Sequence, residues 1–222
     1  VCVGHPLAQQ IPLEHDLTAA KQQLQLASNQ QTIGLLPGSR SGEVSRLAPL
    51  LFDAALKLLK VKPALQFLVP AINQARLVQI QAILDNYPAQ LKQAIQVIEA
   101  QESNSKVGRD VMAASDLVLL ASGTATLECL LFGRPMVVVY KLNWLTFLIV
   151  SWMIKIPYKS LPNILANREV VPELIQHDAT PNKVFQAALQ LLATQKGDVQ
   201  HQVLKQIHQQ LQVLSKSKKM VW

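Results

Sequence analysis

The chain has 222 residues, of which 50% are hydrophobic and 5% aromatic, a balance that favours an aliphatic α/β core over an all-β sandwich and excludes a disordered chain. Its 21 basic and 14 acidic residues give a net charge of +7, which favours anionic partners such as nucleotides, nucleic acids or acidic membranes. Charge alone does not select among these partners, because a basic surface also serves solubility.

The first half of the chain alternates between strand-like and helix-like segments. Short apolar runs bounded by turn residues predict strands, and apolar residues three or four positions apart predict helices. We expect strands at Thr32–Leu36, Leu65–Val69 and Ile95–Ile98, and helices at Val44–Leu59 and Gln74–Asn86.

The same alternation continues in the second half. The expected elements are a helix at Val107–Ala114, a strand at Leu117–Leu120, a helix at Thr124–Leu131 and a strand at Met136–Tyr140. The C-terminal part, Pro181–Ser215, predicts two helices rich in Gln and Leu that separate near Lys196-Gly197-Asp198. Their amphipathic pattern indicates packing and no chemistry.

The expected strands are almost continuously apolar, which is typical of strands buried on both faces. With a helix between successive strands, this predicts a doubly wound parallel sheet with right-handed crossovers. Ligands of such sheets bind outside the carboxyl ends of the strands. Two motifs lie at those ends, and each should present backbone N–H groups at a helix N-terminus, where an anion is favoured.

The first motif reads LLPGSR over residues 35–40. Gly38 completes a turn signal, Ser39 offers a hydroxyl, and the planar guanidinium of Arg40 suits a diphosphate. Glu43 belongs to the same loop; the alternative is a surface ion pair between Glu43 and Arg40, which would contribute little. The loop lacks the Gly-Lys-Ser/Thr ending of a Walker A motif, and the chain has no GxGxxG fingerprint, which disfavours NTPases and dehydrogenases.

The second motif reads ASGTATLE over residues 121–128. Gly123 allows close backbone approach of a ligand, and Ser122 and Thr124 can cap the helix or donate to phosphate oxygens. Glu128 shares a helix face with Thr124 and can accept hydrogen bonds from a ribose diol. The alternative is a capped helix start with a dipole-favourable carboxylate, although the apolar neighbours of Glu128 make an unpartnered carboxylate costly there. Together, the motifs predict a nucleotide-sugar pocket.

A third segment, Ser160-Leu161-Pro162-Asn163, precedes an apolar run. Asn163 is therefore expected to be a helix N-cap, and spacing alone does not extend its role to ligand binding.

Residues 144–154 form the most apolar stretch, but it is shorter than the ~20 residues that a membrane-spanning helix needs. Aromatic and aliphatic residues recur along one stripe, and lysines flank it, which suits a helix lying in a membrane interface. A buried helix or a dimer contact is the alternative. The expected membrane contacts are Trp144, Phe147, Leu148 and Trp152.

The cysteines and histidines of the sequence do not indicate a disulfide framework or a metal site. Cys2 and Cys129 are far apart in the sequence, which disfavours a disulfide framework and indicates a reducing compartment. The five histidines lack metal-ligand spacing, so we expect no metal and no cofactor. The first ten residues lack the pattern of a signal peptide.

Four segments together resemble lipid-A-disaccharide synthases: LLPGSRSGEV, VPAINQAR, ASDLVLLASGTATLECLLFGRPMVVVYK and SLPNILANREVVPELIQ. The resemblance runs from about Val3 through the C-terminal helices, and its motifs are distinctive in order and spacing. It implies an inverting glycosyltransferase of GT-B architecture that lies peripherally on the cytoplasmic face of the inner membrane. Such enzymes join UDP-2,3-diacylglucosamine to 2,3-diacylglucosamine 1-phosphate and release UDP without a required metal.

The resemblance also implies where the UDP-sugar donor is bound. Asn73 and Arg76 match the family pattern less fully, because Ala71 and Gln74 depart from it, and Tyr140 is a further candidate. The main implied contacts are Ser39, Arg40, Glu43, Ser122, Gly123, Thr124, Glu128 and Asn163.

On this resemblance the chain corresponds to the donor-binding half. Residues 1–31 are expected to be a linker and remnant of the preceding acceptor domain, 32–180 a UDP-sugar-binding Rossmann-like domain, and 181–222 helices that pack on the acceptor half or on a partner chain. The general base is expected in the acceptor half, because Asp110 and Asp116 are explained by a strand start or a cap. We therefore expect UDP binding without turnover, and a second copy or a separate N-terminal half as partner.

Two other functions stay open. A different UDP-sugar enzyme of GT-B fold, such as an epimerase, would keep the same phosphate and ribose contacts. A non-catalytic nucleotide or nucleic-acid module is motivated by the charge. For nucleic acid, however, aromatics are scarce and the lysines cluster only at Lys216, Lys218 and Lys219, so no nucleic acid partner is expected.

Overall fold

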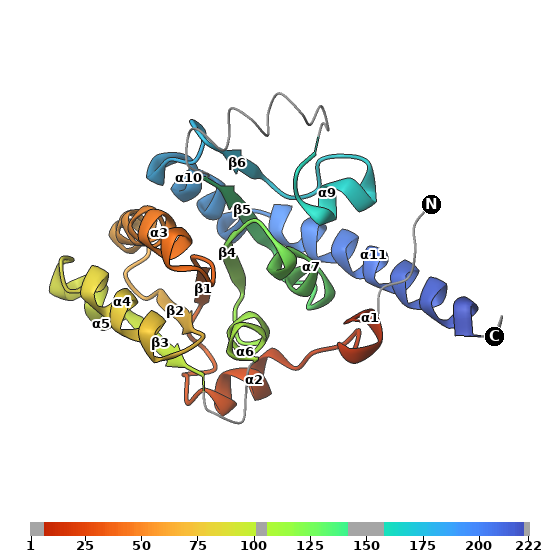
Figure 1. Ribbon diagram of the computed structural model, residues 1–222, viewed down its shortest axis with the longest axis horizontal. Coiled ribbons are helices and arrows are strands. Elements are labelled where there is room, and N and C mark those ends of the chain that lie inside the picture. Colours follow the sequence, from red (N-terminus) through yellow and green to blue (C-terminus); the bar gives the residue numbers. More distant parts are fainter. Residues whose placement is uncertain (1–6, 101–105, 142–157, 220–222) are drawn as a thin grey trace.

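The computed structural model describes residues 7–100, 106–141 and 158–219 (Figure 1). Its centre is a six-stranded parallel sheet in the order β3-β2-β1-β4-β5-β6. The direction of winding reverses between β1 and β4, which makes their carboxyl ends the switch point where ligands of such sheets bind. The strands are β1 (Thr32–Leu36), β2 (Gln66–Ala71), β3 (Ile95–Glu99), β4 (Leu117–Ala121), β5 (Met136–Tyr140) and β6 (Glu173–Ile175).

Helices cover both faces of this sheet, so the doubly wound fold expected from the sequence is confirmed (Figure 1). One layer holds α3 (Ser41–Val61), α4 (Gln74–Leu84), α5 (Ala89–Ala94) and α10 (Pro181–Ala193). The other holds α1 (Leu7–Gln10), α2 (Leu17–Gln23), α6 (Val107–Ala113), α7 (Thr124–Leu131), α9 (Leu161–Ala166) and α11 (Lys196–Lys219).

The strands supply both cores because successive side chains point to opposite faces. In β1, Leu35 joins the core beneath α3 and α10, whereas Leu36 joins the core beneath α7 and α11. Helix α3 presents an apolar stripe that includes Leu47, Leu51 and Leu58, all buried. Burial on both sides explains why the central strands lack the alternation of polar and apolar residues seen in half-exposed strands.

The elements differ from expectation mainly at the margins. Helices α1, α2 and α5 and strand β6 were not expected. The break between the C-terminal helices falls at Thr194 and Gln195, because Lys196, Gly197 and Asp198 already belong to the first turn of α11. Gly197 fits there because a β-carbon at this position would lie 2.5 Å from the carbonyl oxygen of Leu191.

The segment before β1 is tied to the amino end of the sheet. Lys21 of α2 is buried, and its Nζ donates to Asp116 Oδ2 at 2.8 Å. The same carboxylate oxygen accepts the backbone N–H of Thr32 at 2.8 Å, so one side chain joins α2 to the starts of β1 and β4. The expected structural role of Asp116 at a strand start is confirmed; Asp110 lies in the first turn of α6.

The C-terminal helices pack on this chain's own sheet. Helix α10 lies against α3, and α11 runs along α7, α9 and α1 (Figure 1). Leu204, Ile207 and Leu211 of α11 are buried in the second core, so this apolar stripe is covered within the chain.

Among the helices within the described ranges, none has both the length and the hydrophobicity that crossing a bilayer requires. The membrane contacts expected at Trp144, Phe147, Leu148 and Trp152 lie outside the described residues.

Candidate functional site

A cleft of about 630 Å³ opens at the carboxyl ends of β1, β2 and β4, where the fold rule places a ligand. The loop after β1 forms one wall, the loop after β4 forms another, and α6 contributes Arg109 and Met112 between them. The cleft brings together all the residues that the two motifs were expected to contribute: Ser39, Arg40, Glu43, Ser122, Gly123, Thr124 and Glu128.

The loop after β1 is held in shape by its own carboxylate. Gly38 has a φ of +108°, a conformation that favours glycine. Glu43 Oε2 accepts the backbone N–H groups of Ser39 and Arg40 at 3.2 and 3.3 Å. These two N–H groups are therefore engaged within the protein, whereas within the described residues the N–H groups of Ser41 and Gly42, in the first turn of α3, have no acceptor.

The side chain of Arg40 faces outward from this loop. It is 87% exposed, and its Nη1 lies 3.9 Å from Glu43 Oε1, at the outer limit for an ion pair. Such a loose, solvated contact holds the guanidinium weakly. Arg40 is therefore free to turn toward an anionic ligand in the cleft.

The loop after β4 leads directly into α7. Gly123, with a φ of +157°, is the N-cap of α7, and no side chain caps this helix end. The backbone N–H and the hydroxyl of Thr126 both donate to the carbonyl oxygen of Gly123. Within the described part of the chain, the N–H groups of Thr124 and Ala125 have no acceptor. This helix N-terminus therefore has the free donors and the dipole that favour an anion.

Glu128 lies one turn further along α7 and has a partner that the sequence did not indicate. Arg109 Nε of α6 donates to Glu128 Oε1 at 2.8 Å, and the two side chains are 18% and 22% exposed. The pair forms a partly buried floor of the cleft. No periodic signal could have linked them, because 19 residues and strand β4 separate them in the sequence.

Asn163 lies away from this cleft, and its expected position as an N-cap is wrong. Helix α9 begins after Ser160, with Pro162 in its first turn, so Asn163 falls inside the helix. The Asn163 side chain is buried, accepts from the backbone of Val170 and Val171, and donates to Glu173 at 2.8 Å. These contacts hold the chain that leads into β6.

The remaining candidates are also outside the residues that line the cleft. Asn73 caps α4, where its Oδ1 accepts the backbone N–H of Arg76 at 2.9 Å. Tyr140 ends β5. For these residues a donor contact stays a prediction.

Cys129 follows Glu128 but points into the core, and burial raises the pKa of its thiol, which keeps it protonated and unreactive. Within the described residues, no cluster of three or more His, Cys, Asp or Glu side chains could hold a metal ion.

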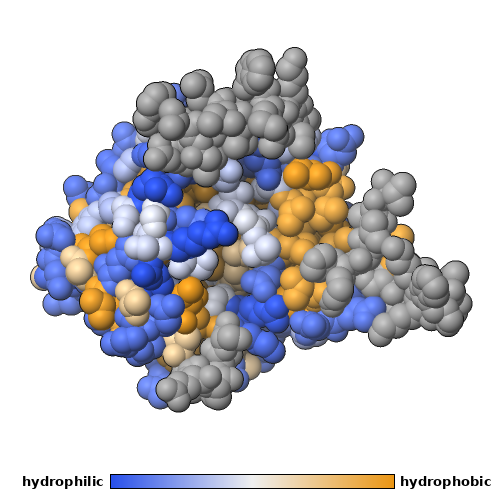
Figure 2. Space-filling view, in the orientation of Figure 1, coloured by the Kyte–Doolittle hydropathy of each residue, from blue (hydrophilic) through white to orange (hydrophobic). Residues whose placement is uncertain are grey.

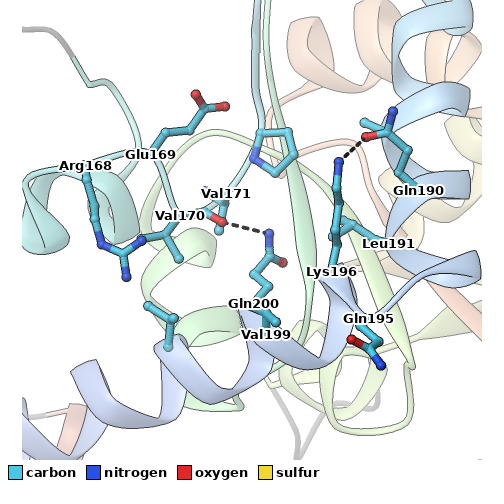
Figure 3. Close-up of a pocket in the computed structure, with 13 residues that line it drawn as sticks. Arg168, Glu169, Val170, Val171, Gln190, Leu191, Gln195, Lys196, Val199 and Gln200 are labelled. Carbon is cyan, nitrogen blue, oxygen red and sulfur yellow. Dashed lines mark hydrogen bonds between the residues drawn. The ribbon is translucent and has the colours of Figure 1, made fainter.

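A second pocket of about 510 Å³ lies between residues 168–172 and helices α10 and α11 (Figure 3). Gln200 closes one side: its Nε2 donates to the carbonyl oxygen of Val170 at 3.0 Å, and its Oε1 accepts the N–H of Met136 at 2.6 Å. Because Met136 begins β5 and Pro172 precedes β6, this pocket lies toward the amino ends of the strands. It contains none of the predicted site residues.

The outer surface is mixed in character. Figure 2 shows hydrophobic surface in the area of α7 and α9, among otherwise largely hydrophilic surroundings. Two large side chains of α9, Leu161 and Ile164, are 36% and 43% exposed.

Comparisons with known proteins agree with this architecture. The C-terminal domain of a glycosyl transferase group 1 family protein from Francisella tularensis superposes with a TM-score of 0.59 at 14% identity, covering 97% of this chain and 98% of that one. A UDP-GlcNAc 2-epimerase from Neisseria meningitidis superposes with a TM-score of 0.56 at 16% identity, covering 91% and 48%. At these identities the likeness shows the fold alone, the Rossmann-like half of a GT-B protein.

Sequence relatives are more specific. The lipid-A-disaccharide synthase of Acinetobacter baylyi is 47% identical over 94% of this chain and 53% of its own length. That of Idiomarina loihiensis is 41% identical over 97% of this chain and 55% of its own. The chain thus spans about half the length of the curated relatives it matches. Residues 1–221 match the model of the lipid-A-disaccharide synthetases, and the chain belongs to this family.

Proposed function

We propose that this chain is the donor-binding half of a lipid-A-disaccharide synthase. The observation that carries the proposal is the pairing, in one cleft, of the uncapped N-terminus of α7 with the exposed guanidinium of Arg40. Such a site suits the diphosphate of a UDP-sugar, because N–H donors, a helix dipole and an arginine all favour the same anion.

The spacing along α7 supports a nucleotide in one orientation. Thr124 and Glu128 lie one helical turn apart, about 6 Å along the axis. A nucleoside diphosphate can therefore place its phosphates at the N-terminus of α7 and its ribose hydroxyls at the carboxylate of Glu128. Ser39 and Ser122 line the same cleft and supply further hydroxyl donors.

This arrangement can stabilise the negative charge that develops during glycosyl transfer. As the sugar departs, negative charge builds on the UDP diphosphate, and donors fixed before reaction stabilise it. Arg40 and the N–H groups of α7 would serve that purpose. The proposed donor is UDP-2,3-diacylglucosamine and the proposed acceptor is 2,3-diacylglucosamine 1-phosphate, with inversion at the transferred sugar.

Among the described residues that line the cleft, no free carboxylate could act as the general base. Of the acidic residues that line it, Glu43 accepts two backbone N–H groups and Glu128 is paired with Arg109. We therefore assign deprotonation of the acceptor hydroxyl to an acceptor half, present as a separate chain or as a preceding domain. In this division residues 32–180 bind UDP-sugar, residues 1–31 lead in from the acceptor half, and residues 181–222 complete the domain.

We also propose attachment to the cytoplasmic face of the inner membrane. The lipid nature of both substrates and the composition of residues 144–154 support it. Co-sedimentation with anionic liposomes, compared between wild type and Trp144→Ser plus Trp152→Ser, tests this proposal. Equal sedimentation of the two proteins would contradict it.

Calorimetric titration with UDP tests the donor-binding role. We expect the chain to bind UDP and Arg40→Ala to bind it about tenfold or more weakly, the usual scale for a hydrogen bond to a charged group. Arg46→Ala is the matched control, because Arg46 is an exposed arginine of α3 that does not line the cleft. Absence of UDP binding, or equal losses in both variants, would contradict the proposal.

A second candidate, a UDP-sugar epimerase, shares the fold and would share these contacts. The two functions differ in product. Mixing the chain with an acceptor half and both lipid substrates should yield disaccharide and UDP, whereas an epimerase would isomerise UDP-N-acetylglucosamine without lipid. Disaccharide formation by this chain alone would overturn the assignment of the base to an acceptor half.

A further inference from the structure

The ion pair between Arg109 and Glu128 connects two helices at the floor of the cleft, and both residues line it. We propose that Arg109 is a positioning residue that holds Glu128 in the orientation needed to receive a ribose diol, and thereby makes the cleft selective for ribonucleotides. This inference rests on the proposed function, because it concerns the same nucleotide.

Glu128 needs such a partner because of where α7 places it. Leu127 is 6% exposed, and Cys129 and Leu130 are fully buried, so the helix around Glu128 is embedded in the second core. A carboxylate at this boundary would lose hydration without gaining a partner, which is costly. The guanidinium of Arg109 compensates that loss, so the carboxylate can stay ionised at the cleft floor.

The contact leaves part of Glu128 available to a ligand. Arg109 Nε engages Oε1, and within the described residues Oε2 has no hydrogen-bond donor. An ionised carboxylate accepts about four hydrogen bonds, so Oε2 and the remaining lone pair of Oε1 can receive two neighbouring hydroxyls. A planar guanidinium also restricts the rotation of the carboxylate more than a point charge would. The pair is therefore arranged before the nucleotide arrives.

A different role for Arg109 predicts a different dependence on the ligand. If its terminal nitrogens bound the diphosphate directly, its removal would weaken every uridine diphosphate equally, with or without ribose hydroxyls. If it acts through Glu128, its removal matters only when those hydroxyls are present. A comparison of UDP with 2′,3′-dideoxyuridine diphosphate separates these roles.

The experiment is calorimetric titration of both nucleotides into wild type, Arg109→Gln, Glu128→Gln and the double variant. We expect wild type to favour UDP over the dideoxy compound about tenfold or more. Arg109→Gln should reduce this preference to near equality while leaving dideoxy affinity almost unchanged. The double variant should bind UDP no more weakly than Glu128→Gln alone, since residues that act as a unit are not additive.

Two further variants serve as a control and as a conservative replacement of Arg109. Arg168→Gln removes an arginine that lines the pocket of Figure 3 and no part of the cleft, and should leave both affinities unchanged. Arg109→Lys retains the charge but not the planar N–H group, and should restore part of the preference for UDP. It also provides a second test if Arg109→Gln does not fold, as judged by its thermal unfolding.

The outcomes distinguish this inference from the proposed function. If wild type does not bind UDP, the proposed nucleotide site fails and this inference fails with it. If wild type binds both nucleotides equally, the diphosphate site stands, but the ribose role of Glu128 and the positioning role of Arg109 are both wrong. If wild type discriminates and the Arg109 variants discriminate as well, only the positioning role is wrong. Equal weakening of both nucleotides by Arg109→Gln would likewise overturn the role and assign Arg109 to the phosphates.

Discussion

The carboxylate of Glu43 lies directly against the backbone of Gly38, so that a β-carbon at position 38 would come within 2.5 Å of Glu43 Oε2. Gly38→Ala would both strain a φ of +108° and displace the carboxylate that holds the N–H groups of Ser39 and Arg40. We expect a loss of about 1–3 kcal/mol in the free energy of unfolding, measured by urea denaturation, together with weaker UDP binding.

Gly108→Ala is the matched control for that prediction. Gly108 lies in α6, and a β-carbon there would meet nothing within 4 Å. Alanine in a helix should leave stability unchanged or raise it by about 0.4–1 kcal/mol. If both glycine variants lose the same stability, the loop after β1 is not constrained as described.

The contact between Lys21 and Asp116 predicts a large effect of removing the acid. Asp116→Ala would leave the ammonium of Lys21, whose side chain is 4% exposed, without its carboxylate. Removing one partner of a buried pair typically costs about 3–5 kcal/mol, and urea denaturation would measure it. Lys205→Met, which breaks an exposed contact with Glu14, should cost about 0–1 kcal/mol. Similar losses in the two variants would show that α2 is not anchored through Asp116.

Gln200 predicts a measurable link between α11 and the sheet. Gln200→Leu would leave the carbonyl of Val170 without its partner (Figure 3), and the N–H of Met136 without an acceptor. Each unsatisfied buried group costs about 1–3 kcal/mol, so thermal unfolding should occur at a clearly lower temperature. Gln206→Leu changes an exposed glutamine of the same helix and should have little effect. Equal melting temperatures for the two variants would refute the link.

His208 of α11 and the nearby His15 predict acid sensitivity. Burial lowers the pKa of His208, and burial together with the nearby charge of Arg134 lowers the pKa of His15. Below pH 6.5 the unfolded chain therefore binds protons at these histidines more readily than the folded chain does. Their contribution to the free energy of unfolding is fully present above that pH and decreases as the pH falls. Each histidine contributes a slope of at most about 1.4 kcal/mol per pH unit.

Urea denaturation at pH 7.5 and pH 5.5 would measure this difference. His208→Gln removes one of the titrating groups while keeping a side chain that can bond to the carbonyl of Ala8. Its stability should depend less steeply on pH than that of wild type. An unchanged slope would show that protonation of His208 is not linked to folding.

Much of the fold was predictable because its strands are buried on both faces and its helices are amphipathic. Strands β1 and β5 and helix α7 have the expected bounds, since Gly and Pro turn signals delimit them. Strand β6 escaped prediction because it has three half-buried residues and owes its place to pairing with β5. The short helices α1 and α2 are fixed by contacts with α11 and α6, which no local pattern encodes.

The candidate site was predictable to the extent that it is built from continuous motifs. The meeting of the two loops followed from the fold rule for parallel sheets. The contact of Glu43 with the backbone N–H groups of Ser39 and Arg40 did not follow from that rule. Arg109 was missed because its ion pair with Glu128 forms only when α6 and α7 come together in the folded chain. The misplaced N-cap had a local signal, because serine is a favoured N-cap residue and the first helical turn tolerates Pro162.

Gln200 fastens α11 at the amino edge of the sheet, on the side opposite to the cleft. The contacts that hold α11 and the cleft therefore lie at opposite ends of the same strands. Strands β1, β2, β4 and β5 are only five or six residues long. Tighter helix packing at the amino edge would leave nucleotide recognition untouched, whereas a change at Gly38 in the cleft would alter both recognition and stability.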